Sequence, residues 1–201
     1  MYKYIIFDLG GVLIDWNPRH LYRKVFTNED EMEYFLSEIC NSDWNEMQDA
    51  GRSLQEGTQV LIQQHPQYEK MIRLYYDRWT EMLKGPFDET VKLLNHFLLR
   101  SDLEVYALTN WSMETFPLAQ ARYDFLGEFN GIIVSGMEKM KKPDPAIYRL
   151  LLARFNLSPD HCLFIDDNLR NVVAAQNEGI FGIHYVNPSN LMETLRQIEL
   201  I

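Results

Sequence analysis

Apolar and polar positions alternate in two different ways along the 201-residue chain, and the change of pattern divides it into segments. The first apolar run covers residues 4–7 and is followed at once by Asp8 and then by the glycines Gly10 and Gly11. A short apolar run bounded by turn residues is typical of a buried strand, and glycines allow the backbone to approach a ligand. The pattern therefore predicts a buried strand with one carboxylate at its tip, although ordinary turn chemistry would also place an acid there.

Apolar positions have helical spacing from Trp16 to about Lys84, where we find no convincing strand. Ser53 is expected to cap one of these helices, which His65-Pro66 ends, and a further helix is expected over residues 68–82. The aromatic stripe Tyr75, Tyr76 and Trp79 is then interpreted as part of the core of a helical block.

Strands and helices alternate after Gly85-Pro86. Helices are expected over residues 88–99, 113–125, 144–155 and 169–178, and strands over residues 103–108, 131–134, 162–165 and 181–186. Such alternation predicts right-handed crossovers and a parallel sheet. The expected fold is α/β, with a Rossmann-like parallel sheet core (residues 1–14 and 86–201) and an inserted α-helical cap domain (residues 15–85).

Charge and cysteine content narrow the classes of partner and compartment. Lys and Arg number 19 against 29 Asp and Glu, and the net charge of −10 argues against nucleic acid or an anionic membrane as a partner. Cys40 and Cys162 both lie in apolar surroundings and do not make a disulfide framework. With no signal peptide and no apolar run long enough to span a bilayer, a cytoplasmic location is expected.

Polar residues follow several of the predicted strands. Because parallel sheets bind ligands outside the carboxyl ends of their strands, these residues are expected at one edge; they are Asp8, Thr109, Asn110, Ser135, Gly136, Asp166 and Asp167, with Lys142 before the next helix. Crowded carboxylates repel one another unless a cation lies among them, and Mg²⁺ prefers carboxylate oxygens together with a phosphate. A lysine and a hydroxyl could hold the phosphoryl oxygens while Asp8 attacks phosphorus.

Four ordered segments resemble the motifs of the haloacid dehalogenase-like hydrolase superfamily, and the helical block falls where that family inserts its C1-type cap. The segments are Phe7-Asp8-Leu9-Gly10-Gly11-Val12-Leu13, Leu108-Thr109-Asn110, Lys142-Pro143-Asp144-Pro145-Ala146-Ile147-Tyr148 and Phe164-Ile165-Asp166-Asp167-Asn168. The first and last look most like those of the α-D-glucose-1-phosphate phosphatase group.

This resemblance implies roles for individual residues. Asp8 resembles the nucleophile and a magnesium ligand, together with the backbone carbonyl of Gly10. Asp167 resembles the fourth-motif magnesium ligand, and Asp166 is either a ligand or a partner behind it. Thr109 and Asn110 resemble the phosphate-holding pair. Lys142 resembles the neutralising lysine because it directly precedes the proline, which leaves Lys141 as a solvated surface charge.

Position 10 departs from the family pattern. Most phosphatases of the family have an acid two residues after the nucleophile, which protonates the leaving group, and here that residue is Gly10. Hydrolysis of a sugar 1-phosphate would be slowed least by the absence of this acid, because its anomeric hydroxyl is a more acidic leaving group than an ordinary alcohol. Asp15 or a cap acid such as Asp49 could replace the missing group, although Asp15 could equally cap a helix.

Residues 44–52 resemble the cap loop that dips toward the substrate in this cap type. Gly51 would permit its sharp turn. Trp44 could stack on a sugar, or could be a core residue of the cap.

The sequence thus predicts a Mg²⁺-dependent phosphatase for a small phosphate ester such as a sugar 1-phosphate, acting through an aspartyl-phosphate, as a monomer or homodimer. The alternatives are a metal-independent 2-haloacid dehalogenase, which would tolerate Gly10 but not easily the pair Asp166-Asp167, and a non-catalytic protein that binds a phosphorylated metabolite.

Overall fold

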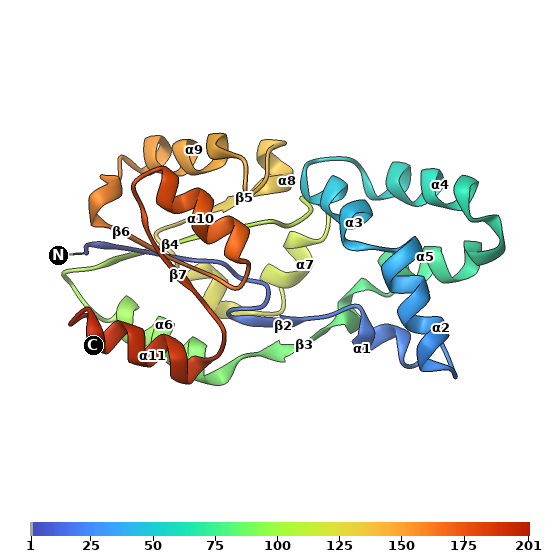
Figure 1. Ribbon diagram of the computed structural model, residues 1–201, viewed down its shortest axis with the longest axis horizontal. Coiled ribbons are helices and arrows are strands. Elements are labelled where there is room, and N and C mark those ends of the chain that lie inside the picture. The colour runs from blue at the N-terminus through green and yellow to red at the C-terminus, as the bar shows by residue number, and fades with distance from the viewer. Residues whose placement is uncertain (1) are drawn as a thin grey trace.

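Five parallel strands form the central sheet of the computed structural model, which describes residues 2–201, and their order is β5-β4-β1-β6-β7 (Figure 1). The strands are β1 (Tyr4–Phe7), β4 (Glu104–Thr109), β5 (Gly131–Val134), β6 (Cys162–Asp166) and β7 (Phe181–His184). The chain adds β4 and β5 on one side of β1 and then β6 and β7 on the other. The carboxyl ends of β1, β4 and β6 therefore meet at the point where the winding reverses, which is where such sheets bind ligands. The predicted α/β class is confirmed.

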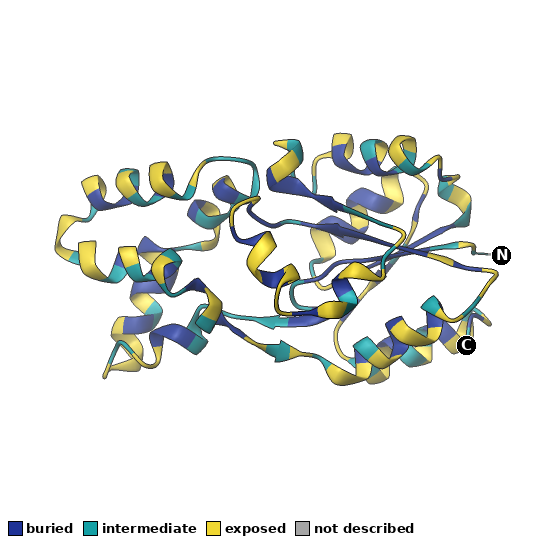
Figure 2. Ribbon diagram, turned by 180° about the vertical axis from the view of Figure 1, so that it is seen from behind, coloured by how far each residue is buried: buried dark blue, intermediate teal, exposed yellow. Residues whose placement is uncertain are grey.

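Both faces of the sheet are covered by helices. Successive strand residues point to opposite sides, so apolar side chains emerge on both faces and both faces have to be buried. Ile6 packs in a cluster with residues of α9 (Pro145–Phe155) and α10 (Leu169–Asn177). Its neighbours Ile5 and Phe7 belong to a second cluster with residues of α6 (Asp88–Leu98) and α11 (Pro188–Gln197). In Figure 2 the strands between these helices are buried, and the outer sides of the helices are exposed.

The segment between β1 and α6 forms a helical lobe at one end of the molecule, away from both termini (Figure 1). Its helices are α1 (Arg19–Tyr22), α2 (Glu29–Tyr34) with a π-helical continuation over Phe35–Ile39, α3 (Ser42–Asp49), α4 (Leu54–Gln64), a 3₁₀ turn over Pro66–Tyr68, α5 (Glu69–Asp77) and a second 3₁₀ turn over Trp79–Met82. We call this lobe the cap. Ser53 caps the start of α4 as expected, and its Oγ accepts a hydrogen bond from the Glu56 amide at 3.1 Å.

Two short antiparallel strands join the cap to the core, β2 (Ile14–Trp16) and β3 (Leu83–Pro86). The expectation of no strand between residues 16 and 84 was therefore wrong at both ends of that range. Three- and four-residue strands that contain Asp15 and Lys84 are too short and too polar to produce an alternating pattern.

Two long predicted helices are broken. In place of a helix over residues 113–125, the chain forms α7 (Phe116–Gln120) and a 3₁₀ turn over Asp124–Gly127. Pro117 lies in the first turn of α7, where its missing amide is tolerated, and it prevents the helix from extending further back. The predicted helix over residues 68–82 likewise ends at Asp77 and continues only as the second 3₁₀ turn of the cap.

Some elements were not predicted: α8 (Ser135–Glu138), a 3₁₀ turn over Pro159–His161 and the carboxyl-terminal helix α11. Within residues 2–201, every helix is too short or too polar to cross a bilayer.

Candidate active site

Asp8 lies directly beyond β1 and is almost fully buried, with 8% of its surface exposed. Its Oδ1 accepts a hydrogen bond from the Leu9 amide at 2.7 Å, and its Oδ2 lies 3.0 Å from Nζ of Lys142. Burial raises the pKa of Asp8 well above its ordinary value, and the carboxylates of Asp166 and Asp167 raise it further, whereas Lys142 lowers it. The lysine therefore helps to keep this carboxyl ionised.

Lys142 reaches the same place from the loop before α9, and its side chain is fully buried. Its ammonium donates to the Leu108 carbonyl at 2.8 Å and to Oδ2 of Asp166 at 2.6 Å, and it lies over the Phe164 ring. Burial by itself would lower the pKa of Lys142, but the carboxylates of Asp166 and Asp8 outweigh burial and raise it. Lys142 is thus a fixed cation between two carboxylates.

Asp166 ends β6 and is completely buried. Both of its oxygens accept hydrogen bonds from the Asn171 amide, at 3.0 and 3.1 Å, and Oδ1 also accepts from the Asn168 backbone at 2.7 Å. With the Lys142 bond added, the carboxylate is well satisfied by the protein. This arrangement favours a role in holding Lys142 over a role as a direct metal ligand.

Asp167 is more exposed and lies close to Gly11. Gly11 has a φ of +77°, and a Cβ at this position would lie 2.1 Å from Oδ2 of Asp167. A side chain at residue 11 would therefore displace the carboxylate. Burial and the neighbouring Asp166 raise the pKa of Asp167, and Lys142 offsets this only in part.

Oxygens of Asp8, Asp166 and Asp167 lie within 4.8 Å of one another. Three carboxylates share one ammonium group, so the cluster has an excess of negative charge in a largely buried place. Carboxylate oxygens at this spacing suit a hard divalent cation such as Mg²⁺, which would relieve the repulsion. The donor set therefore fits the expected metal.

Thr109 ends β4, beside β1, and is 1% exposed. Within residues 2–201, its Oγ1 is a buried hydroxyl for which no hydrogen-bond partner is found. A buried polar atom without a partner is costly, so this atom is an acceptor or donor available to a ligand.

Asn110 has its side chain committed elsewhere. Its amide donates to the Lys142 carbonyl at 2.9 Å and its Oδ1 accepts from the Lys142 amide at 2.8 Å. The side chain thus fixes the loop that carries the lysine, and the expected contact with phosphate is left to the Asn110 backbone.

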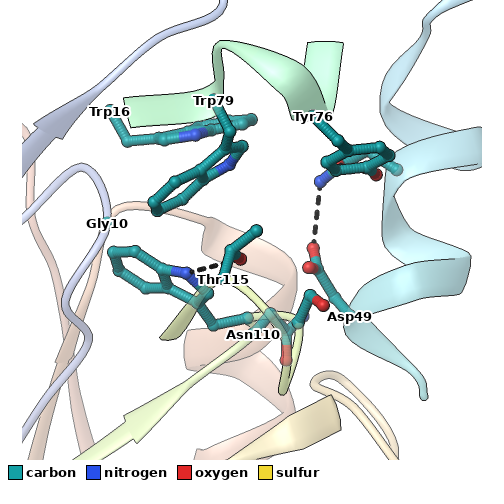
Figure 3. Close-up of a pocket in the computed structure, with 10 residues that line it drawn as sticks. Gly10, Trp16, Asp49, Tyr76, Trp79, Asn110 and Thr115 are labelled. Carbon is teal, nitrogen blue, oxygen red and sulfur yellow. Dashed lines mark hydrogen bonds between the residues drawn. The ribbon is translucent and has the colours of Figure 1, made fainter. Parts of the chain in front are cut away.

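A cleft of about 520 Å³ opens above these groups, between core and cap. It is lined by Asp8, Gly10, Gly11 and Asp167 from the core and by Asn17, Arg19, Ser42, Asn45, Glu46, Asp49 and Tyr75 from the cap side, among others. A smaller pocket of about 60 Å³ adjoins it, and Gly10, Asn110 and Asp49 line both cavities. Figure 3 shows Trp16 and Trp79 along one side of the smaller pocket, with Asp49 across from Gly10.

Trp44 does not line either cavity, so of its two expected roles, stacking on a sugar and packing in the cap core, the structure favours the second. It is 8% exposed, its indole N–H donates to the Gly57 carbonyl at 2.9 Å, and its ring packs edge-on against Tyr75. Burial of the large ring and its satisfied N–H make it a core residue of the cap. From the aromatic stripe, by contrast, Tyr76 and Trp79 line the smaller pocket.

Gly51 brings the end of α3 close to α8. It has a φ of +101°, and a Cβ would lie 3.0 Å from Cγ of Lys139 and 3.3 Å from the Gly136 carbonyl. The turn expected at this glycine is present, and the glycine contacts the core.

Lys141 is not a solvated surface charge, as the sequence had suggested. Its ammonium pairs with Glu46 on α3 of the cap, and Arg170 of α10 pairs with the other oxygen of the same carboxylate. The residues next to Lys141 in the sequence could not predict this pair, because Glu46 lies 95 residues away in the chain.

Asp15 and Asp49, the two candidates for a replacement acid, lie in different places. Asp15 is on β2, where its carboxylate is 2.8 Å from Nε2 of His20 and 4.0 Å from Nζ of Lys84. Asp49 faces the smaller pocket, and its Oδ2 accepts a hydrogen bond from the Asn45 amide at 3.1 Å (Figure 3).

Two residues support the site in ways that the sequence did not predict: Asn171, which was not singled out, and Ser135, which was expected at the sheet edge without a role. Asn171 orients Asp166 from the first turns of α10, and its one signal is an amide placed five residues after the acid. Ser135 Oγ accepts from the Trp111 amide at 2.9 Å and donates to the Asp49 carbonyl, so it joins the Thr109 loop to the cap.

The sequence matches a family model over residues 2–179, and that model describes haloacid dehalogenase-like hydrolases. The chain is 30% identical to the sesquiterpene phosphatase astK of Aspergillus oryzae over 204 residues, which cover 98% of this chain and 96% of that protein. It is 25% identical to a phosphorylated carbohydrates phosphatase of Thermotoga maritima, over 90% of this chain and 84% of that one.

A crystal structure of a haloacid dehalogenase family enzyme from Bacteroides thetaiotaomicron, in complex with magnesium and inorganic phosphate, has a similar fold. The TM-score is 0.67 at 21% identity, and the match covers 91% of this chain and 93% of that one.

Proposed function

The chain belongs to the haloacid dehalogenase-like hydrolase family, and from this premise we propose that it is a Mg²⁺-dependent phosphatase of small phosphate monoesters. The observation that carries the proposal is the cluster of three carboxylates around one buried lysine, within 4.8 Å of one another. Two relatives, the sesquiterpene phosphatase and the phosphorylated carbohydrates phosphatase, are named as phosphatases and support the same activity.

In this proposal Asp8, the Gly10 carbonyl and Asp167 hold the cation. Asp166 orients Lys142, and this role takes the place of direct binding to the cation. When bound, Mg²⁺ would neutralise negative charge on the phosphoryl group and on the carboxylates around it.

The chain's own residues would carry the reaction. A carboxylate oxygen of Asp8 attacks phosphorus, the bond to the leaving oxygen breaks, and an aspartyl-phosphate forms on Asp8. The Lys142 ammonium and the Thr109 hydroxyl hold phosphoryl oxygens in place. Water then attacks the aspartyl-phosphate, which releases inorganic phosphate and restores Asp8.

A sugar phosphate, such as a sugar 1-phosphate, is the proposed substrate class. The cap side of the cleft offers hydrogen-bonding side chains such as Asn17, Ser42 and Asn45, which suit a leaving group rich in hydroxyls. The phosphorylated carbohydrates phosphatase among the relatives supports the same class.

A phosphate of an apolar alcohol is the second candidate, and the smaller pocket favours it. Trp16, Trp79 and Trp111 line that pocket, and indole rings bind apolar groups well. The relative named as a sesquiterpene phosphatase agrees with this candidate.

We propose a reducing cytoplasm as the location, because Cys40 and Cys162 are both buried and unpaired.

The experiment that tests the function measures phosphate release from p-nitrophenyl phosphate, sugar phosphates and terpenoid alcohol phosphates, with and without Mg²⁺. We expect activity that requires Mg²⁺ and is abolished by Asp8→Asn, whereas Asp30→Asn, which changes an exposed acid of α2, leaves it unchanged. Full activity in excess chelator would contradict the proposal. Chloride release from 2-chloropropionate without metal would instead support a dehalogenase.

A further inference from the structure

We propose that Asp49, a residue of the cap, is the general acid and base of this enzyme in place of the acid missing at position 10. The proposal rests on the phosphatase function proposed above. It assigns to a cap residue a role that the family's motifs place in the core.

The position of Asp49 is the first support. Asp49 and Gly10 line the same two cavities, and Asn110, which follows Thr109, lines both as well. Among the described residues around the smaller pocket, Asp49 is the one carboxylic acid. The carboxyl therefore lies on the cap side of the site, where the leaving group of a bound phosphate must project.

Asp49 is also held in that position from three sides. The Asn45 amide donates to its Oδ2, the Ser112 backbone donates to its carboxylate, and its own carbonyl accepts from Ser135. Ser112 lies in the loop that follows Thr109. The cap acid is thus tied directly to the loop that would hold the phosphate, which is the rigidity that a proton donor needs.

Protonation of Asp49 is favoured by its surroundings. Burial and the neighbouring Glu46 raise the pKa of Asp49 to about 7, and Lys141 opposes them. From α5, Tyr75 and Tyr76 also face the group; burial raises the pKa of each phenol well above 10, so both stay neutral. A carboxyl that titrates near neutral pH can both give and take a proton there.

The other acids near the cleft are committed elsewhere. Both oxygens of Glu46 contact cations, one Lys141 and the other Arg170. Asp15, on the connecting strand β2, contacts His20 of α1 and Lys84 of β3.

Asp49 acts twice in the proposed reaction, first as an acid and then as a base. As the bond between phosphorus and the leaving oxygen breaks, that oxygen keeps the electron pair and takes the proton of Asp49. The Asp49 carboxylate then takes a proton from the attacking water, whose oxygen bonds to phosphorus. The bond to Asp8 breaks, and inorganic phosphate leaves with Asp49 protonated again.

The test compares two leaving groups in the presence of Mg²⁺. The p-nitrophenolate ion leaves without a proton, so its initial burst reports attack by Asp8 alone, whereas an alkyl alcohol needs a proton to leave. We expect Asp49→Asn to keep the burst rate and to slow release of alcohol from an alkyl phosphate by roughly 100- to 10,000-fold. Asp15→Asn, the control, changes neither rate.

A rescue sharpens the result. A Cβ at Gly10 would meet nothing within 4 Å, and Gly10 is not in the left-handed region. The double variant Gly10→Asp, Asp49→Asn should therefore regain much of the alkyl phosphatase activity. Asp49→Asn is nearly isosteric, and a thermal melt shows whether it folds.

The wild-type enzyme offers an independent measure. The alkyl reaction should fall as pH rises through about 7, because the acid loses its proton, while the p-nitrophenolate burst should not. An unchanged alkyl rate in Asp49→Asn, or an equal loss for both leaving groups, would overturn the assignment. If the wild type releases no p-nitrophenolate at all in the presence of Mg²⁺, the phosphatase function itself is contradicted.

Discussion

At the scale of single residues, the absence of a side chain at Gly11 leaves room for Asp167, the most exposed acid of the carboxylate cluster. A Cβ on Gly11 would lie 2.1 Å from Oδ2 of Asp167, and the φ of +77° is itself unfavourable for other residues. The metal-binding geometry proposed here therefore depends on a residue that makes no bond to the metal.

Gly11→Ala should displace Asp167 and weaken Mg²⁺ binding by roughly 10- to 100-fold, as changes that misplace metal ligands do. The measurement is the Mg²⁺ concentration that gives half-maximal phosphatase activity. Gly127→Ala is the matched control, because a Cβ there meets nothing within 4 Å. Equal Mg²⁺ requirements for the two variants would show that Asp167 is not a ligand.

At the scale of elements, the junction of α3 with the core is fixed by buried hydrogen bonds. Ser135, the first residue of α8, is fully buried and bonds both to the Trp111 amide and to the Asp49 carbonyl. Gly51, two residues after Asp49, permits the same close approach. The cap loop, the Thr109 loop and α8 are thus positioned together.

Ser135→Ala should lower the free energy of unfolding by about 1–3 kcal/mol, because the Trp111 amide loses its buried partner. It should also slow alkyl phosphate hydrolysis more than the p-nitrophenolate burst, since Asp49 loses an anchor. Denaturant unfolding and the two assays measure these effects. Ser37→Ala, which changes an exposed serine of the cap, should do neither; if both variants behave alike, Ser135 does not position the acid.

At the scale of the whole molecule, cap and core are joined by one continuous apolar cluster. Tyr75 and Trp44 of the cap belong to the same cluster as Ile5 and Phe97 of the core, and Trp79 meets Trp111 across the boundary. Stability and the active site are therefore coupled, because Asp49, an acid that lines the active-site cleft, is partly buried where the two parts meet.

The pH dependence of unfolding should reveal that coupling. The pKa of Asp49 is about 7 in the folded state and about 3.9 when unfolded, so between these values the folded state holds the extra proton. The free energy of unfolding falls as pH rises through this window, by about 4 kcal/mol at most.

Asp49→Asn should remove this fall in the free energy of unfolding with rising pH, because asparagine does not titrate. Its melting temperature relative to the wild type should rise from pH 4 to pH 7.5, as measured by thermal melts, whereas Asp77→Asn, an exposed acid of α5, should show no such trend. A constant difference would mean that the pKa of Asp49 is not raised by folding.

Much of the core could be predicted from the sequence, because buried strands are short apolar runs and their next polar residues must lie at one edge. Asp8, Asp166 and Asp167 were found in this way. The predicted helices over residues 144–155 and 169–178 also match α9 and α10 closely.

Long-range partners could not be predicted. The pairing of Asn110 with the Lys142 backbone, of Lys141 with Glu46 and of Ser135 with Asp49 joins residues that are distant in the chain. Trp44 could not be placed either, because an indole suits a cap core and a substrate cleft equally well until its neighbours are known.

The strand order has a consequence for how the chain acquires its structure. Tyr4 of β1 pairs with Glu104 and with Cys162, so the central strand finds its neighbours only after the whole cap has been synthesised. Closing such long loops costs conformational entropy before the strand pairs form and stabilise the sheet, and this slows folding. On the ribosome, the strand that Asp8 follows emerges first and is among the last to find its partners.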